Sequence, residues 1–85
     1  MFLDQPLVSI CIPVYNGEKY IDETIQCCLN QSYKNIEVIV SDNCSTDKTI
    51  ELIKKYNDPR IKIYTNQKNE GLVYNFKKVL EIIVL

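Results

Sequence analysis

Two short, mainly apolar runs and one short run of alternating apolar and polar residues, all containing β-branched residues, alternate along the chain with stretches whose apolar residues recur at helical spacing. The runs predict strands at residues 7–14, 36–40 and 61–64. Strands that alternate with helices pair in parallel through right-handed crossovers. The sequence therefore predicts an α/β fold of order β-α-β-α-β-α. This is a three-layer, Rossmann-like half of a parallel sheet, with strand order 3-2-1.

Three helices are expected between and after these strands. The first runs from Glu18 to about Gln31, the second follows residues 45–47, which can cap it, and the third begins at Gly71. Pro59 ends the second helix, because a proline ring cannot continue one. The expected core-facing residues are Ile21, Ile25, Cys28, Leu29, Ile50, Ile53, Leu72, Phe76, Val79, Leu80 and Ile83.

Composition limits the classes of function. A length of 85 residues allows one small domain, and 46% hydrophobic content with only two glycines and three prolines argues against disorder. The formal net charge is −1. A chain so nearly neutral has no strong electrostatic attraction to nucleic acid or to an anionic membrane, so we expect neither as a partner.

Histidine is absent, and four cysteines occur: Cys11, Cys27, Cys28 and Cys44. None forms a C-x-x-C pair, which argues against a zinc site. We interpret all four as reduced, which indicates a cytoplasmic protein. The first residues lack the basic start of a signal peptide, and no apolar run approaches the roughly 20 residues needed to span a membrane.

Polar residues gather where the predicted strands end. They are Tyr15, Asn16, Ser41, Asp42, Asn43, Thr65 and Asn66. In open α/β sheets, ligands bind outside the carboxyl ends of the strands, so this edge is the candidate binding site. The motifs G-x-G-x-x-G and G-x-x-x-x-G-K-[ST] are absent, which argues against a dinucleotide fold and a P-loop. Without histidine, nucleophile–His catalysis is excluded.

Four motifs follow one another along the chain. P-x-Y-N-x-E spans 13–18, N-Q-S-Y-K-N-I-E spans 30–37, D-N-C-S-T-D spans 42–47, and N-x-G spans 69–71. In this order, over roughly Pro6 to Glu81, the chain resembles the family 2 glycosyltransferases. The resemblance implies a GT-A fold, whose N-terminal half binds a nucleotide diphospho-sugar.

Matched position by position, the resemblance implies eight nucleotide-binding residues: Pro13, Tyr15, Asn16, Glu18, Asp42, Asn43, Asn69 and Gly71. Tyr15 can cover the face of a base. A carboxylate such as Asp42 can accept a hydrogen bond from N3 of uracil or thymine, and the amide of Asn43 can donate or accept. The implied donor is a UDP- or dTDP-sugar. Asn69 and Gly71 would lie on its sugar-phosphate side, with Asn75 close to them.

Each of these residues also has a simpler structural interpretation. Residues 13–17 can form an ordinary strand-to-helix turn, and Asp42 is a frequent turn residue. Glu18 suits the first turn of a helix, where the helix dipole favours acids. Residues 69–71 suit a loop and a helix start. The tyrosines outside the motifs are interpreted as packing residues: Tyr20, Tyr33, Tyr56 and Tyr64.

The family's Asp-x-Asp metal motif and catalytic base lie beyond the position that matches Leu85. We therefore expect residues 1–85 to form a single partial domain with no catalytic residue and no metal of its own. Mg or Mn is expected for the full-length enzyme. This chain would be the donor-binding region of a glycosyltransferase, inactive alone. A stand-alone nucleotide-binding or assembly module without catalysis is the alternative.

Two features predict a homo-oligomer. In a 3-2-1 sheet the first strand, Val8 to Val14, lies at an edge with unpaired backbone groups, which can template pairing with another chain. The end of the chain, residues 79–85, is apolar almost all round. Association through the edge of the first strand, the C-terminal helix, or both would cover them.

Overall fold

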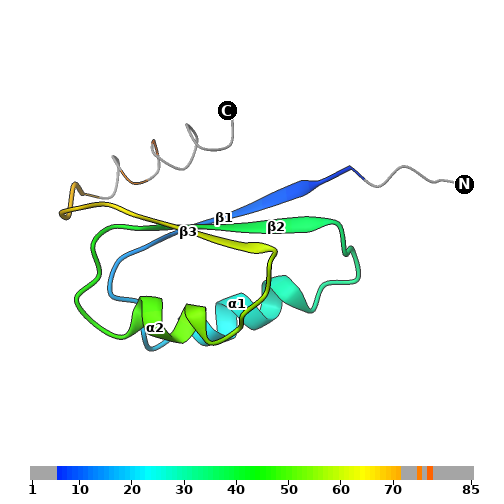
Figure 1. Cartoon of the computed structure of the whole chain (residues 1–85), viewed down its shortest axis with the longest axis horizontal. Coiled ribbons are helices and arrows are strands. Elements are labelled where there is room, and N and C mark those ends of the chain that lie inside the picture. Colours follow the sequence, from blue (N-terminus) through cyan, green and yellow to red (C-terminus); the bar gives the residue numbers. More distant parts are fainter. Residues whose placement is uncertain (1–5, 72–74, 76, 78–85) are drawn as a thin grey trace, which may run out of the picture.

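The computed structural model describes residues 6–71, 75 and 77. Five elements follow one another along the chain (Figure 1): β1 at Val8–Val14, α1 at Ile21–Leu29, β2 at Ile36–Asp42, α2 at Thr49–Lys54 and β3 at Ile61–Thr65. This order confirms the predicted alternation up to the third strand. Asn75 and Lys77 are helical, and the rest of the helix expected from Gly71 lies outside the described residues.

The three strands form one parallel sheet in the order β1-β2-β3, which matches the predicted order 3-2-1. In the register, Val14 lies opposite Asp42, and Asp42 lies opposite Thr65. All three strands therefore end at one edge. The polar residues that follow them are brought together there by the topology.

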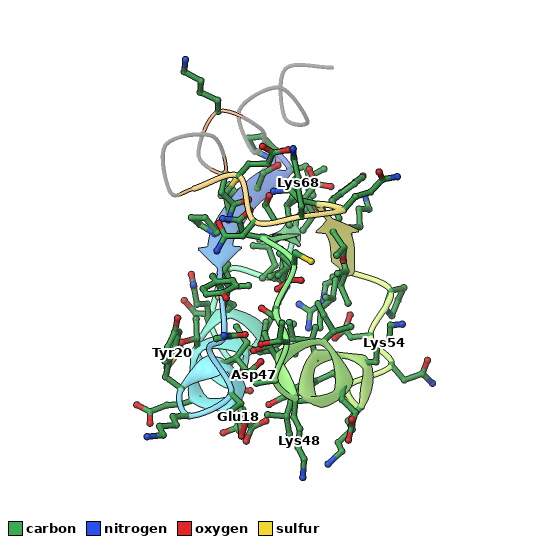
Figure 2. All side chains as sticks on the ribbon, turned by 90° about the vertical axis from the view of Figure 1, so that its left-hand side faces the viewer. Glu18, Tyr20, Asp47, Lys48, Lys54 and Lys68 are labelled. Carbon is green, nitrogen blue, oxygen red and sulfur yellow. The ribbon has the colours of Figure 1, made fainter. Side chains whose placement is uncertain are left out.

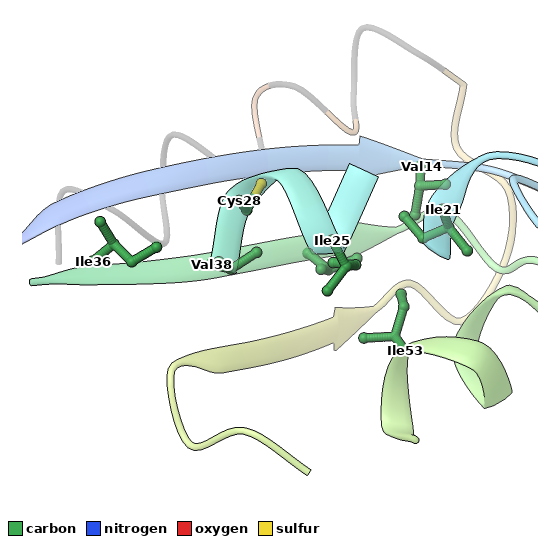
Figure 3. Packing of buried hydrophobic residues seen from close by; sticks show 8 residues of the cluster. Val14, Ile21, Ile25, Cys28, Ile36, Val38 and Ile53 are labelled. Atoms are coloured by element: carbon green, nitrogen blue, oxygen red, sulfur yellow. The ribbon is translucent and has the colours of Figure 1, made fainter. Parts of the chain in front are cut away.

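Helices α1 and α2 cover the same face of the sheet (Figure 1). Between this face and the helices lies the core (Figure 3): Val14, Ile21, Ile25, Cys28, Ile36, Val38, Val40 and Ile53. Alternate residues of β2 point to the helices, as period-two geometry requires. The predicted helix faces are confirmed in α1, where Cys28 is buried and its neighbour Cys27 is exposed.

The opposite face of the sheet is also covered near its carboxyl edge. Ile39, which points away from the two helices, is only 3% exposed. Asn75 contacts Ser41 on this face: its Nδ2 donates to the Ser41 carbonyl over 2.9 Å, and Ser41 Oγ donates to its Oδ1 over 2.5 Å. The complete third layer stays a prediction, because most of its residues lie outside the described part.

Element ends differ from the prediction by a few residues. β2 continues beyond Val40 through Ser41 and Asp42, because pairing in a ladder uses main-chain groups and does not require apolar side chains. α1 begins at Ile21 rather than Glu18. The Gly17 carbonyl accepts from the amides of Tyr20, over 3.0 Å, and Ile21, over 2.8 Å, so residues 18–20 form a turn.

All four cysteines are free thiols. Burial raises the pKa of Cys28 and, together with the negative charge of Glu37, that of Cys11, so both are held in the protonated form. None of the helices in the described ranges is long and apolar enough to cross a membrane.

Candidate functional site

A pocket of about 390 Å³ opens at the carboxyl ends of β1 and β2. Eight of the described residues line it: Pro13, Val14, Tyr15, Tyr20, Asn43, Asn69, Gly71 and Asn75. Five of them belong to the set implied by the motifs. Asn75 adjoins that set, as expected, while Val14 and Tyr20 were not assigned to it. Three implied residues, Asn16, Glu18 and Asp42, are absent from the lining.

A second hollow, of about 290 Å³, lies between α2 and the amino end of β3. Its lining is Ile53, Lys54, Asn57, Asp58, Pro59, Ile61 and Ile63. The carboxylate of Asp58 accepts hydrogen bonds from Arg60 over 2.8 to 3.2 Å, which lower the pKa of Asp58. Ligands of parallel sheets bind at the carboxyl edge, so we assign the candidate site to the larger pocket.

Asn43 organises the side of the pocket formed by the loop after β3. Its Nδ2 donates to Asn69 Oδ1 over 2.8 Å and to the Gly71 carbonyl over 3.3 Å. Its Oδ1 accepts from Asn66 Nδ2 and from the Glu70 amide, each over 2.9 Å. Two N–H groups and two lone pairs are the full capacity of an amide. Asn43, only 3% exposed, therefore fixes residues 66–71 with its whole side chain.

Asp42 acts on the loop after β1 rather than on the pocket surface. It is 1% exposed, and its carboxylate accepts hydrogen bonds from the Ser45 hydroxyl and, over 3.0 Å, from the Ser45 amide. The Ser45 hydroxyl in turn accepts from the Asn16 amide over 2.8 Å. A buried carboxylate is thereby satisfied, and it holds the segment that follows Tyr15.

Asn16 and Glu18, in the loop after β1, also bond to the loop after β2. Asn16, at φ 50, accepts from the Thr46 amide through Oδ1 over 2.7 Å. Glu18 accepts from the Lys48 amide over 3.4 Å and donates its own amide to Asp47 over 3.2 Å. Figure 2 shows Glu18 and Asp47 close together where the segments leading into α1 and α2 meet. These contacts fix one loop against the other.

Thr49 also links the loop after β1 to the start of α2. It is fully buried, and its hydroxyl accepts from the Gly17 amide over 2.8 Å while donating to Asp47. Asp47 also accepts from the Thr49 amide over 3.0 Å. Burial alone would raise the pKa of Asp47, but the bonds from Thr49 and Glu18 lower it overall. Of the expected caps at residues 45–47, only Asp47 bonds to the first turn of α2; Ser45 and Thr46 bond to the β1 loop.

The two tyrosines of the pocket are exposed. Tyr15 and Tyr20 retain 45% and 52% of their accessible surface, and Tyr64 retains 41%, so neither Tyr20 nor Tyr64 packs into the core as their interpretation as packing residues implied. Within the described part of the chain, neither hydroxyl makes a hydrogen bond. Tyr20 lies at the start of α1, on the side that faces away from α2 (Figure 2). The sequence did contain a signal that could have assigned Tyr20 to the pocket. It lies three residues after Gly17, at the start of a predicted helix and beside the carboxyl edge of the predicted sheet.

A metal centre needs several ligating side chains grouped together. Within residues 6–71, 75 and 77, no three His, Cys, Asp or Glu side chains are grouped closely enough to hold a metal ion. The carboxylates of Asp42 and Asp47 already accept hydrogen bonds from Ser45 and Thr49. The described residues therefore do not fit a metal centre, and we derive no metal-dependent step from them.

Solved structures share this fold. The chain superposes on TarS from S. aureus with a TM-score of 0.81 and 32% identity, covering 89% of this chain and 24% of that one. It superposes equally well, at 0.81 and 24% identity, on the mannosyltransferase PcManGT from Pyrobaculum calidifontis, solved in complex with GDP-Man and Mn2+. That likeness covers 93% of this chain and 25% of the other, and at this identity it concerns the fold alone.

Sequence comparison agrees with the fold. Over 71 residues the chain is 48% identical to an uncharacterized glycosyltransferase of Haemophilus influenzae, an alignment covering 81% of this chain and 28% of that protein. The chain thus spans about a quarter of the length of each of these three proteins. The model of the family described as Glycosyl transferase family 2 matches residues 9–83. Because this is most of the chain, the protein belongs to glycosyl transferase family 2.

Proposed function

We propose that this chain is the donor-binding region of a glycosyltransferase and binds a nucleotide diphospho-sugar in the 390 Å³ pocket. The observation that carries the proposal is the coincidence of the pocket with the family motifs. Its lining draws on the first motif at Pro13 and Tyr15, on the third at Asn43, and on the last at Asn69 and Gly71. PcManGT, of the same fold, was solved with the nucleotide sugar GDP-Man.

Of the eight implied residues, five line the pocket and three do not. Pro13 and Tyr15 form a wall for the base, while Asn69 and Gly71 lie on the sugar-phosphate side. Asn43 fixes that side through its amide. Asp42, Asn16 and Glu18 contribute indirectly, because their hydrogen bonds to residues 45–48 hold the loop that carries Tyr15.

The proposed base is uracil or thymine, the bases that the family motifs imply. Guanine, the base in the PcManGT complex, is the competing assignment. A titration with different nucleotides distinguishes it from uracil and thymine. For the full-length enzyme we propose Mg2+ or Mn2+, since a divalent cation stabilises a diphosphate leaving group. The described residues do not supply its ligands.

We also propose self-association, with a second copy as the partner. β1 lies at one edge of the sheet, and Leu7 and Val8 at its start are 55% and 46% exposed. An apolar edge strand can pair with its equivalent in another chain. The C-terminal helix expected to share this role lies outside the described residues. An assembly module without catalysis remains the competing function, and it predicts association without nucleotide binding.

A nucleotide titration tests the proposed function. The ¹⁵N-labelled chain is titrated with UDP, dTDP and GDP, and amide shifts are followed by NMR. We expect saturable shifts at residues lining the pocket, with a Kd weaker than about 0.1 mM because only part of a donor site is present. The same samples, given UDP-sugars and Mg2+ or Mn2+, should show no turnover. Shifts scattered over the surface, or none, would contradict donor binding.

A further inference from the structure

We infer that Tyr20 is a second aromatic binding residue for the base of the nucleotide, beside Tyr15, an inference that rests on the function proposed for the pocket. Both tyrosines line the pocket, and both keep about half of their surface exposed. They come from different segments: Tyr15 follows β1, and Tyr20 precedes the first turn of α1. Base faces stack on such rings whatever the base.

The Tyr20 ring lies against Gly17. A Cβ built on Gly17 would lie 2.8 Å from Cζ and 2.9 Å from Oη of Tyr20. The far end of the ring therefore rests directly on the glycine backbone. The Tyr20 amide also donates to the Gly17 carbonyl over 3.0 Å. This contact restricts where the ring can lie, and a ring restricted before a ligand binds loses less freedom on binding.

Much of the polar lining is paired within the protein, which leaves the two tyrosine hydroxyls and Asn69 Nδ2 without a partner among the described residues. Asn43 spends both N–H groups and both lone pairs inside the protein. Asn75 is paired with Ser41 through both of its amide atoms. The hydroxyls of Tyr15 and Tyr20 make no hydrogen bond with the described residues. A phenol can donate and accept, so these two groups can bond to a base edge or a ribose hydroxyl.

Tyr20 differs from the tyrosines that serve packing. Tyr33 and Tyr56 lie against the core, and their hydroxyls donate within the protein, Tyr33 to the Pro6 carbonyl and Tyr56 to the Asp22 carbonyl and carboxylate. Tyr20 lacks both features. A half-exposed ring that lies against a glycine backbone and lines a pocket is the arrangement expected of a ligand contact.

The test compares tyrosine variants in NMR titrations of the chain with UDP, dTDP, GDP and inorganic pyrophosphate. Tyr20→Leu keeps an apolar side chain on Gly17 and removes the aromatic ring. It should raise the Kd of the preferred nucleotide about fivefold or more, since stacking on a ring is lost. Pyrophosphate shifts should not change. Tyr20→Phe retains the ring and should stay within about threefold of wild type.

The matched control is Tyr64→Leu. Tyr64 is 41% exposed and lies outside the pocket, so its variant should bind as wild type does. Equal weakening by Tyr20→Leu and Tyr64→Leu would overturn the inference. In the wild-type complex, nuclear Overhauser contacts between the Tyr20 ring and base protons are expected. Their absence at saturation, beside contacts from Tyr15, would equally overturn it, whether or not the variants fold.

Tyr15→Leu separates the two proposals. If it weakens binding while Tyr20→Leu does not, the pocket binds nucleotide and only the role of Tyr20 is wrong. If neither change affects a measurable titration, or if the wild type binds none of the nucleotides, donor binding at this pocket fails and the inference fails with it.

Discussion

The side-chain amide of Asn43 donates a hydrogen bond to the side-chain carbonyl of Asn69 over 2.8 Å, across 26 positions of sequence. The same carbonyl accepts from the Gly71 amide over 2.8 Å. Asn43, the residue that follows β2, therefore shapes the loop after β3. Two of the four family motifs meet in this contact, and it closes one side of the pocket.

Asn43→Ala should destabilise the fold by about 2 kcal/mol, because a nearly buried amide that makes four hydrogen bonds is removed and several partners are left unpaired. The free energy of unfolding is measured by urea denaturation. The loop should loosen as well, so the amides of Glu70 and Gly71 should exchange faster with solvent.

Gln67→Ala is the control for this change. Gln67 lies in the same loop with an exposed side chain, and truncating it should alter stability by less than about 0.5 kcal/mol. If the two variants are equally stable, Asn43 does not organise the loop.

The strands and the position of the site were predictable because they follow from patterns along the chain. Apolar runs marked β1 and β2, and parallel topology placed the residues after them at one edge. What each polar side chain does there was not predictable. Asp42 and Asn43 are adjacent, yet one bonds to Ser45 three positions on and the other to a loop more than 20 positions away. Only the folded loops decide between these partners.

Which tyrosine side chains are exposed was equally unpredictable from the sequence. Tyr20, Tyr33 and Tyr56 all have helical or loop neighbours of similar polarity, and only the last two pack on the core. The difference depends on Gly17, because its missing Cβ leaves the space in which the Tyr20 ring lies. A local pattern does not record such a contact between a ring and a backbone.

Thr49→Val should release the turn after β1. The change keeps the shape of a fully buried side chain but removes the hydroxyl that accepts from Gly17. A buried N–H without a partner costs about 1 to 3 kcal/mol. Amide hydrogen exchange at Gly17 should therefore speed up. Thr49→Ser keeps the hydroxyl and loses a methyl, so it should lower stability while Gly17 stays protected. Equal exchange in both variants would refute this role.

Gly17→Ala should be destabilising by about 1 to 3 kcal/mol through overpacking, since the new Cβ would lie 2.7 Å from Val14 Cγ2 and 2.8 Å from Tyr20 Cζ. The Tyr20 ring should shift, which its NMR ring resonances report. Gly71→Ala provides the contrast. Gly71 has φ +89 and no atom within 4 Å of a new Cβ, so its cost is backbone strain, and the Tyr20 resonances should stay unchanged. Matching ring shifts in both variants would count against the contact.

A polar row crosses all three strands on the face of the sheet opposite α1 and α2. Ser9 Oγ donates to Glu37 Oε2 over 2.5 Å, and Lys62 Nζ donates to Glu37 Oε1 over 2.7 Å. The side chain of Glu37 is 17% exposed. The bonds from Lys62 and Ser9, in that order of importance, lower the pKa of Glu37, and the carboxylate raises the pKa of Lys62.

Acid should weaken the fold partly through Glu37. Because its pKa is lower in the folded state than the value of about 4.3 for an unfolded glutamate, its contribution is present above that value and is lost as the pH falls through the folded pKa. Urea midpoints of wild type and Glu37→Gln should therefore differ most at pH 7 and converge towards pH 3. Glu51→Gln, at an exposed site on α2, removes the same charge and should run parallel to wild type. A gap between wild type and Glu37→Gln that stays constant from pH 7 to pH 3 would show that the row adds no pH-dependent stability.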